Sequence, residues 1–323
     1  MRKYTFLIIK LVLFVGICTW IVKSVNITES LNVLKKTNLL YYLIAFLLSN
    51  LSNIFLTIKW HRLSTPLNIK STFWELLCLN YISVFYSIFI PGQASGEVIK
   101  GLKLIKKEGS HQTIWVPIFI DKITNVLIVF IIGSIATLLD SNFRKNTSLV
   151  ILLITITALL VLLTLILFSE NTTKIVDFLK KILINILTIF KLNTQFIKNF
   201  SVDYFENYKK QDLILLETLM WSLFIKIPPV FSLYFLALSL NIDLNIIQSA
   251  WLFSLVSVVS LLPISFSGLG VREGTIIVLL SKIGIPNSFS LSLSMLIFTT
   301  GILMGLIGGA LELVSSFRLF KSK

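Results

Sequence analysis

Long apolar stretches alternate with short polar ones along the whole chain. Most of the apolar stretches approach the ~20 residues that a helix needs to cross the hydrocarbon core of a bilayer. They lie at about 4–22, 39–58, 74–90, 114–138, 148–168, 213–240, 246–262, 273–285 and 290–317. The pattern predicts an all-α, polytopic membrane protein, and the composition agrees, because 55% of the residues are hydrophobic and only 14% are charged.

Two interrupted regions predict broken or re-entrant helical hairpins. Segment 74–90 breaks at 91–96 and then returns, and segment 246–262 breaks at 263–270 before 271–285. The two breaks are locally alike, since each has a proline, small residues and a glycine, followed by an acid and a base. Paired interruptions in two halves of a chain indicate a binding site at the interface of an inverted repeat. We therefore expect about six full spans plus two hairpins; a bundle of eight or nine complete spans is the alternative.

The charge distribution predicts the orientation. The chain has 29 Lys and Arg against 15 Asp and Glu, a net charge of +14. Such an excess would suit nucleic acid, but most basic residues lie in loops between apolar segments, where positive charge favours the cytoplasmic side. Loop 169–212, with seven lysines, then lies inside together with both termini, although Lys23, Lys35 and Lys36 oppose this arrangement. We expect a multi-pass protein of a bacterial-type inner membrane and no nucleic-acid partner.

The basic loop 169–212 also predicts a surface helix. Between Lys174 and Lys191 the polar positions recur with a helical period, and Ile, Leu and Phe stand between them. A basic amphipathic helix of this kind lies on the inner leaflet; an ordinary packed helix is the alternative. We otherwise expect residues 1–323 to form one integral-membrane domain.

The second break contains the strongest candidate site. Irregular backbone survives at membrane depth only where it lines a cavity or packs against protein. A helix that begins near Gly270 would point its free backbone N–H groups into the break, and the backbone N–H groups near Gly268 would face the same space. Such a helix end attracts anions. Arg272 adds a planar donor group suited to phosphate, with Glu273 beside it. The alternative is an Arg–Glu contact that only holds the loop.

The first break offers a similar pair. Glu97 and Lys100 stand three residues apart, so on a helix they share a face and can interact. We assign both to the binding site, with Lys100 as the counterpart of Arg272. The alternative is that Lys100 extends to the membrane interface.

A third candidate group lies inside segment 114–138. Asp121, Lys122 and Asn125 are several residues from either end, and Asp121 and Asn125 share a helix face. Charged groups at such depth indicate a buried polar network that contacts either ligand or a neighbouring helix. Glu217 and Lys226 give a weaker signal of the same kind.

Two further patterns concern packing. The run Lys59-Trp60-His61-Arg62 closes a helix, and basic and aromatic residues at a helix end predict interface anchoring. Small residues on the last helix predict close helix packing. They are Gly301, Gly305, Gly308 and Gly309.

Motifs of common membrane enzymes are missing from the sequence. It has no nucleotide-binding P-loop, no acidic metal-diphosphate motif and no Ser/His/Asp arrangement. Its two cysteines and two histidines have no metal-ligand spacing. We therefore expect no catalytic residue, no metal and no cofactor.

Several of these runs together resemble the transmembrane flippase-like family, typified by the membrane part of bacterial lysylphosphatidylglycerol synthase. The resemblance covers nearly the whole chain, and the last motif is the most specific. The motifs are Lys59-Trp60-His61-Arg62, Pro91-Gly92…Gly96-Glu97…Lys100, Asp121-Lys122…Asn125 and Pro263…Gly268-Leu269-Gly270-Val271-Arg272-Glu273-Gly274. The family usually has Arg where this chain has Lys100, and Glu-Arg then Asp where it has Asp121-Lys122 and Asn125.

The resemblance implies a lipid translocase. In that family the membrane domain moves a charged phospholipid between leaflets, and the chain lacks the soluble aminoacyl-transferase domain that would synthesise such a lipid. We expect the partner to be a membrane lipid with an anionic or amphoteric headgroup, bound in an intramembrane cavity. A separate lipid-modifying synthase or glycosyltransferase is a second expected partner. The alternatives are an integral-membrane enzyme or an accessory scaffold in lipid-linked glycan or surface polysaccharide synthesis.

Overall fold

The fold is all-helical wherever the computed structural model describes it, which confirms the predicted class. The described residues are 25–90, 95–108, 111–144, 147–167, 213–261 and 270–321, with residues 19, 23 and 208. The helices are α2 (Ile27–Lys35), α3 (Leu39–Ser64), η1 (Thr65–Leu67), α4 (Phe73–Phe89), α5 (Ser95–Glu108), α6 (His111–Leu139), α7 (Ser141–Arg144), α8 (Thr147–Leu167), α12 (Ile214–Ser239), α13 (Ile246–Ser260), α14 (Val271–Ser281) and α15 (Asn287–Lys321).

Four stretches of helix in the described ranges are long and apolar enough to cross a membrane. They lie in α3 with η1, α6, α12 and α15, and run over Leu39–Leu67, Ile114–Leu139, Ile214–Ser239 and Asn287–Val314. Helices α4, α8 and α13 are apolar but contain shorter stretches. The predicted span 4–22 and the predicted amphipathic helix in 169–212 lie outside the described residues.

Local capping signals explain where several helices begin. Thr72 accepts a hydrogen bond from the Glu75 N–H, and the Glu75 carboxylate accepts one from the Thr72 N–H. Asn245 and Gln248 form the same reciprocal pair before α13. Such capping boxes satisfy N–H groups that a helix start leaves unpaired. They fix the first residue of the leading arm in each predicted hairpin.

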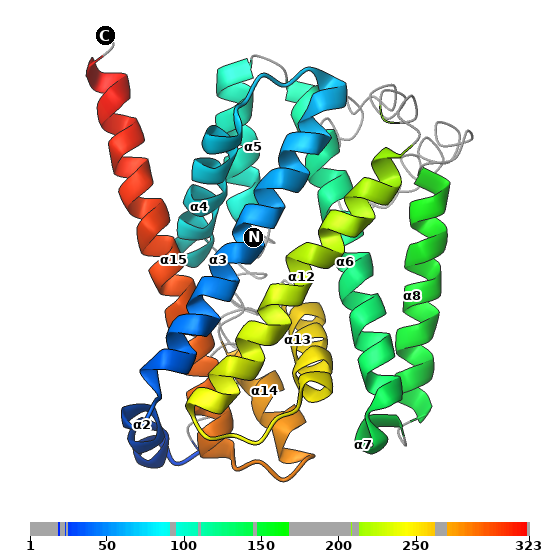
Figure 1. Cartoon of the computed structure of the whole chain (residues 1–323), viewed down its shortest axis with the longest axis vertical. Coiled ribbons are helices and arrows are strands. Elements are labelled where there is room, and N and C mark those ends of the chain that lie inside the picture. The colour runs from blue at the N-terminus through cyan, green and yellow to red at the C-terminus, as the bar shows by residue number, and fades with distance from the viewer. Residues whose placement is uncertain are drawn as a thin grey trace, which may run out of the picture.

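Both predicted hairpins are present. Helices α4 and α5 pack against each other in the upper half of the bundle, and α13 and α14 pack against each other in the lower half (Figure 1). The short connections 91–94 and 262–269 lie outside the described residues. The arms of each hairpin therefore share one half of the bundle, which agrees with the hairpin prediction rather than with complete spans.

The helix contacts repeat between the two halves of the chain. Helices α3 and α12, which open the two halves, pack side by side (Figure 1). Hairpin helix α4 packs on α15, the last helix of the other half, and α13 packs on α6 in the same way. This reciprocal exchange, together with entry from opposite ends, supports the predicted inverted repeat.

The connections gather at two ends of the bundle in a way that fits the predicted topology. The ends of α3, α5, α8 and α15 lie at the top of Figure 1, whereas α2, α7 and the α12–α13 connection lie at the bottom. The described helix ends that border the loops predicted to be cytoplasmic thus share one end. Which end faces the cytoplasm stays a prediction.

The glycine stripe of α15 packs closely on α4. A Cβ atom at Gly308 would collide with the backbone of Tyr81, and one at Gly305 with the side chain of Ile88. Gly309 meets the ring of Phe85 in the same way, whereas a Cβ at Gly301 would have nothing within 4 Å. Close packing is confirmed at three of the four glycines.

Candidate ligand-binding site

A cavity of about 360 Å³ lies where the two hairpins meet the long helices. Its wall includes residues of α3, α5, α6, α12, α13, α14 and α15. Much of this wall is apolar, with several hydroxyl groups. Its four charged residues are Glu97, Lys122, Lys226 and Arg272. A charged hollow at this place matches the sequence-based expectation of a polar site between broken helices.

Arg272 reaches the cavity from the first turn of α14. Gly270, just before the helix, has φ of +81°, a left-handed conformation that glycine adopts without strain. The Arg272 guanidinium lies 2.5 Å (Nη2) and 3.1 Å (Nε) from Glu273 Oε1. Its Nε also lies 3.3 Å from the Ser294 hydroxyl. Arg272 is thus held in one orientation, and the predicted Arg–Glu contact and the cavity position coexist.

The helix start beside Arg272 is less open than the sequence suggested. The Gly270 N–H donates a hydrogen bond to Glu273 Oε2 at 2.6 Å, so this amide is occupied by the protein itself. The expectation that the Gly270 amide is free for phosphate is therefore wrong in this structure. Gly268 lies outside the described residues. Glu273 organises both Gly270 and Arg272 and is absent from the cavity wall.

Glu97 lines the cavity but does not pair with Lys100. Its carboxylate lies 3.1 Å from Lys122 Nζ, and each of the two side chains is about one-third exposed. Lys122 comes from α6, so the contact joins the returning arm of the first hairpin to the next long helix. The shared-face argument predicted a local pair, whereas a tertiary pair forms.

Lys100 is buried beneath the cavity wall. Its exposed fraction is 3%, and its ammonium donates a hydrogen bond to Asn80 Oδ1 at 2.6 Å. The same nitrogen lies 3.3 Å from the centroid of the Trp60 ring, a cation–π contact. Lys100 neither lines the cavity nor extends to the membrane interface. Its assignment to ligand binding stays a prediction that this geometry does not favour.

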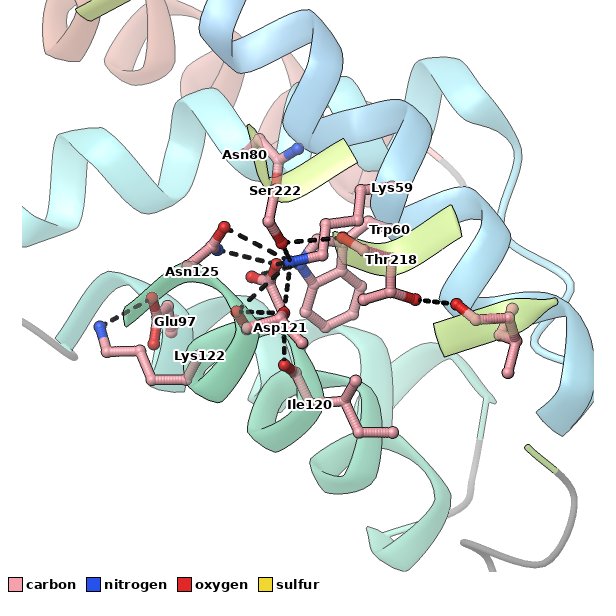
Figure 2. A network of polar contacts seen from close by, with 12 residues as sticks. Lys59, Trp60, Asn80, Glu97, Ile120, Asp121, Lys122, Asn125, Thr218 and Ser222 are labelled. Carbon is pink, nitrogen blue, oxygen red and sulfur yellow. Dashed lines mark hydrogen bonds and ion pairs between the residues drawn. The ribbon is translucent and has the colours of Figure 1, made fainter. Parts of the chain in front are cut away.

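The charged centre of the first half is the ion pair Lys59–Asp121. The two side chains are 1% and 6% exposed, and Lys59 Nζ lies 2.6 Å from Asp121 Oδ1. Figure 2 shows Lys59 at the centre of the network, close to Asp121 and Ser222. Its ammonium also donates to the hydroxyls of Thr124 (2.8 Å) and Ser222 (2.7 Å). The pair therefore ties together helices α3, α6 and α12.

Both carboxylate oxygens of Asp121 have further partners. Asn125 Nδ2 donates to Asp121 Oδ1 at 2.9 Å, and Trp60 Nε1 donates to Asp121 Oδ2 at 3.2 Å. This confirms the predicted buried network and the predicted shared face of Asp121 and Asn125. Asn125 also lines the cavity, so it connects the buried pair to the open space.

The anchoring interpretation of residues 59–62 is wrong for its first two members. Lys59 and Trp60 are 0% and 2% exposed, because they lie on the inward face of α3. Arg62 is 53% exposed and forms an ion pair with Glu217, as an interface position would allow. The sequence signal for the inward face is the pair Asn53 and Thr57, polar residues one turn apart in an apolar helix and both buried.

Lys226 on α12 is a cavity residue that sequence reasoning ranked low. It lies in the wall with Arg272, Lys122 and Glu97. The signal was its place near the middle of a long apolar segment. That signal alone did not distinguish a ligand contact from a helix–helix pair.

Taken together, these features define a polytopic helical membrane protein with a charged cavity between two opposed hairpins. The model of one protein family, Lysylphosphatidylglycerol synthase TM region, matches residues 7–309. The chain belongs to this family, as its motifs indicated.

A curated relative supports the same membership. The chain is 22% identical over 311 residues to the UPF0104 membrane protein PH1989 of Pyrococcus horikoshii. The similarity covers 92% of each protein. The relative is thus a membrane protein matched over nearly its full length.

Proposed function

We propose that this protein is a lipid translocase that binds a charged phospholipid or lipid-linked headgroup in the cavity and aids its transfer between leaflets. The observation that carries the proposal is the cavity itself. It brings four charged side chains to the place where the two hairpins meet, and these hairpins start from opposite ends of the bundle. Charged groups at membrane depth are costly and mark substrate pathways, and sites of this kind lie at the interface of inverted repeats.

Arg272 is the proposed phosphate ligand. Its guanidinium is oriented by Glu273 and Ser294, so little side-chain freedom is lost when an anion binds. Arginine donors also match the geometry of phosphate oxygens. The hydroxyl-bearing and apolar wall would accommodate the glycerol or sugar part and the start of the acyl chains.

The proposal assigns no catalytic chemistry to the chain. A membrane enzyme would need an acid free to protonate or deprotonate a reacting group. Asp121 is buried and paired with Lys59, and Glu97 is paired with Lys122, so both carboxylates that could serve are engaged. This pairing favours transport over the enzyme alternative. The scaffold alternative depends on loop 169–212, which lies outside the described residues.

Leaflet transfer in reconstituted vesicles tests the proposal. Vesicles with acyl-labelled nitrobenzoxadiazole phosphatidylglycerol are treated with dithionite, which bleaches only label in the outer leaflet. Wild-type protein should make the inner-leaflet label reachable. Arg272→Gln should slow transfer about tenfold or more, because a charge-assisted hydrogen bond contributes ~1.5–3 kcal/mol.

Arg62→Gln is the matched control, since it removes an arginine from an exposed ion pair outside the cavity wall. It should leave transfer unchanged. Equal rates for wild type and Arg272→Gln, with both proteins folded by gel filtration, would remove the assigned role of Arg272. No transfer by wild-type protein would reject the translocase itself.

A further inference from the structure

The charges around the cavity do not balance. Among the described residues of the cavity wall and the network beneath it, three carboxylates are each paired with one cation. The pairs are Lys59–Asp121, Lys122–Glu97 and Arg272–Glu273. Two lysines, Lys100 and Lys226, remain without a carboxylate in this region, and an unpaired charge in a low-dielectric interior is unfavourable unless something compensates it.

Lys100 has its compensation inside the protein. The Trp60 ring and the side-chain amide oxygen of Asn80 contact the Lys100 ammonium. Lys100 itself lies outside the cavity wall. A ligand in the cavity therefore has no access to it. Lys226 is the cation left for a ligand.

Lys226 has a different environment. It lies in the cavity wall, and it has no hydrogen bond or ion pair with any residue in the ranges that the structure describes. The charged groups near enough to influence it are Asp121, Glu97, Lys59 and Lys122. These four form two ion pairs with each other, so neither carboxylate is a free counter-charge for Lys226. The cavity thus carries one uncompensated positive charge in its wall, that of Lys226, together with the guanidinium of Arg272, which is paired with Glu273.

We infer that the cavity selects lipids whose headgroup is net negative, a phosphate without a compensating amine, and that Lys226 determines this selectivity. The inference rests on the proposed function. An anionic headgroup supplies the negative counter-charge that Lys226 lacks. A zwitterionic headgroup also brings a protonated amine, which the same lysine repels. A headgroup with a net positive charge, such as an aminoacylated phosphatidylglycerol, is the least favoured, because like charges brought together in a cavity oppose binding.

Three lipid probes in the vesicle assay test the selectivity. They are acyl-labelled phosphatidylglycerol, phosphatidylethanolamine and lysyl-phosphatidylglycerol, which have net negative, neutral and positive headgroups. Wild-type protein should transfer phosphatidylglycerol about tenfold faster than phosphatidylethanolamine, and lysyl-phosphatidylglycerol more slowly still. Lys226→Gln should remove most of the difference between the first two, and Lys226→Arg should restore it. Lys226→Glu should reverse the order.

Lys282→Gln is the matched control, because Lys282 is an exposed lysine at the end of α14, outside the cavity wall. It should keep the wild-type order of the three lipids. Equal transfer of all three lipids by wild type, or an unchanged order in Lys226→Gln, would overturn the inference while leaving the translocase proposal intact.

Binding separates the two proposals if no lipid is transferred. Native mass spectrometry of the purified proteins, each incubated with the same three lipids, measures retention directly. Preferential retention of phosphatidylglycerol by wild type but not by Lys226→Gln would support the charge selectivity even though transport had failed. Equal retention of the three lipids would reject it. Gel filtration and melting temperature in detergent establish that each variant is folded.

Discussion

The first half of the bundle has a charged interior, and the second half has an apolar one, although the helices of the two halves are arranged alike. Around α3, α5 and α6 the buried groups include Lys59, Asp121 and Lys100. Around α12, α13, α14 and α15 they include Trp251, Leu252 and Leu280, each 0% exposed and part of one apolar cluster. The same set of helix contacts is thus filled with two kinds of side chain.

The difference shows that the two halves should respond differently to mutation. A buried ion pair contributes little net stability, but loss of one partner leaves an uncompensated charge. An apolar core loses stability gradually with the volume removed. The cavity lies between these regions, so a ligand meets Glu97 and Lys122 from the first half and Arg272 from the second. Lys226 of α12 adds a second cation from the second half. We therefore expect the first half to contribute the buried ion pairs around the site, and the second half to contribute its anion-binding cations as well as its apolar packing.

The largest effect is expected in the first half. Asp121→Leu should lower the free energy of unfolding by about 3–5 kcal/mol, because Lys59 is then buried without its carboxylate. Chemical unfolding in detergent measures this loss. The double variant Lys59→Met/Asp121→Leu is the control, and it should recover most of the stability. A single variant as stable as the wild type would show that the ion pair is not the centre of this half.

A somewhat smaller effect is expected in the second half. Leu280→Ala should cost about 2–4 kcal/mol, because the side chain is fully buried in the apolar cluster and its removal leaves a cavity. Val278→Ala on the same helix, where the side chain is 44% exposed, should change the same free energy by less than about 0.5 kcal/mol. Similar losses at both positions would contradict the assigned packing of α14.

The smallest of the three effects concerns the contact between the halves. Gly308→Ala should cost about 1–3 kcal/mol, since the new methyl group would force α15 away from the Tyr81 backbone of α4. Gly301→Ala adds the same methyl group where nothing lies within 4 Å, so it should be neutral. Melting temperatures of the two variants in detergent provide the comparison. A Gly301 variant as unstable as the Gly308 variant would contradict the close packing of α15 on α4 as the cause.

Much of the fold could be predicted from hydropathy, because long apolar helices are the stable structure in the hydrocarbon core of a bilayer. Segment 114–138 corresponds to α6 (His111–Leu139), and segment 213–240 to α12 (Ile214–Ser239). The breaks were also visible, since proline and glycine interrupt helices for local reasons. Of the candidate site, Glu97, Lys122, Asn125 and Arg272 line the cavity as expected, whereas Lys226 was underrated.

The sequence by itself determined which residues are helical, which residues of one helix share a face, and that charges lie at membrane depth. It determined these because hydropathy and helical period act over a few neighbouring residues. Only the tertiary structure decided that Lys59 meets Asp121 and that Glu97 meets Lys122 rather than Lys100. It also decided that Lys226 meets no carboxylate among the residues that the structure describes. Those partners lie on different helices, and which helix faces meet depends on the packing of the whole bundle.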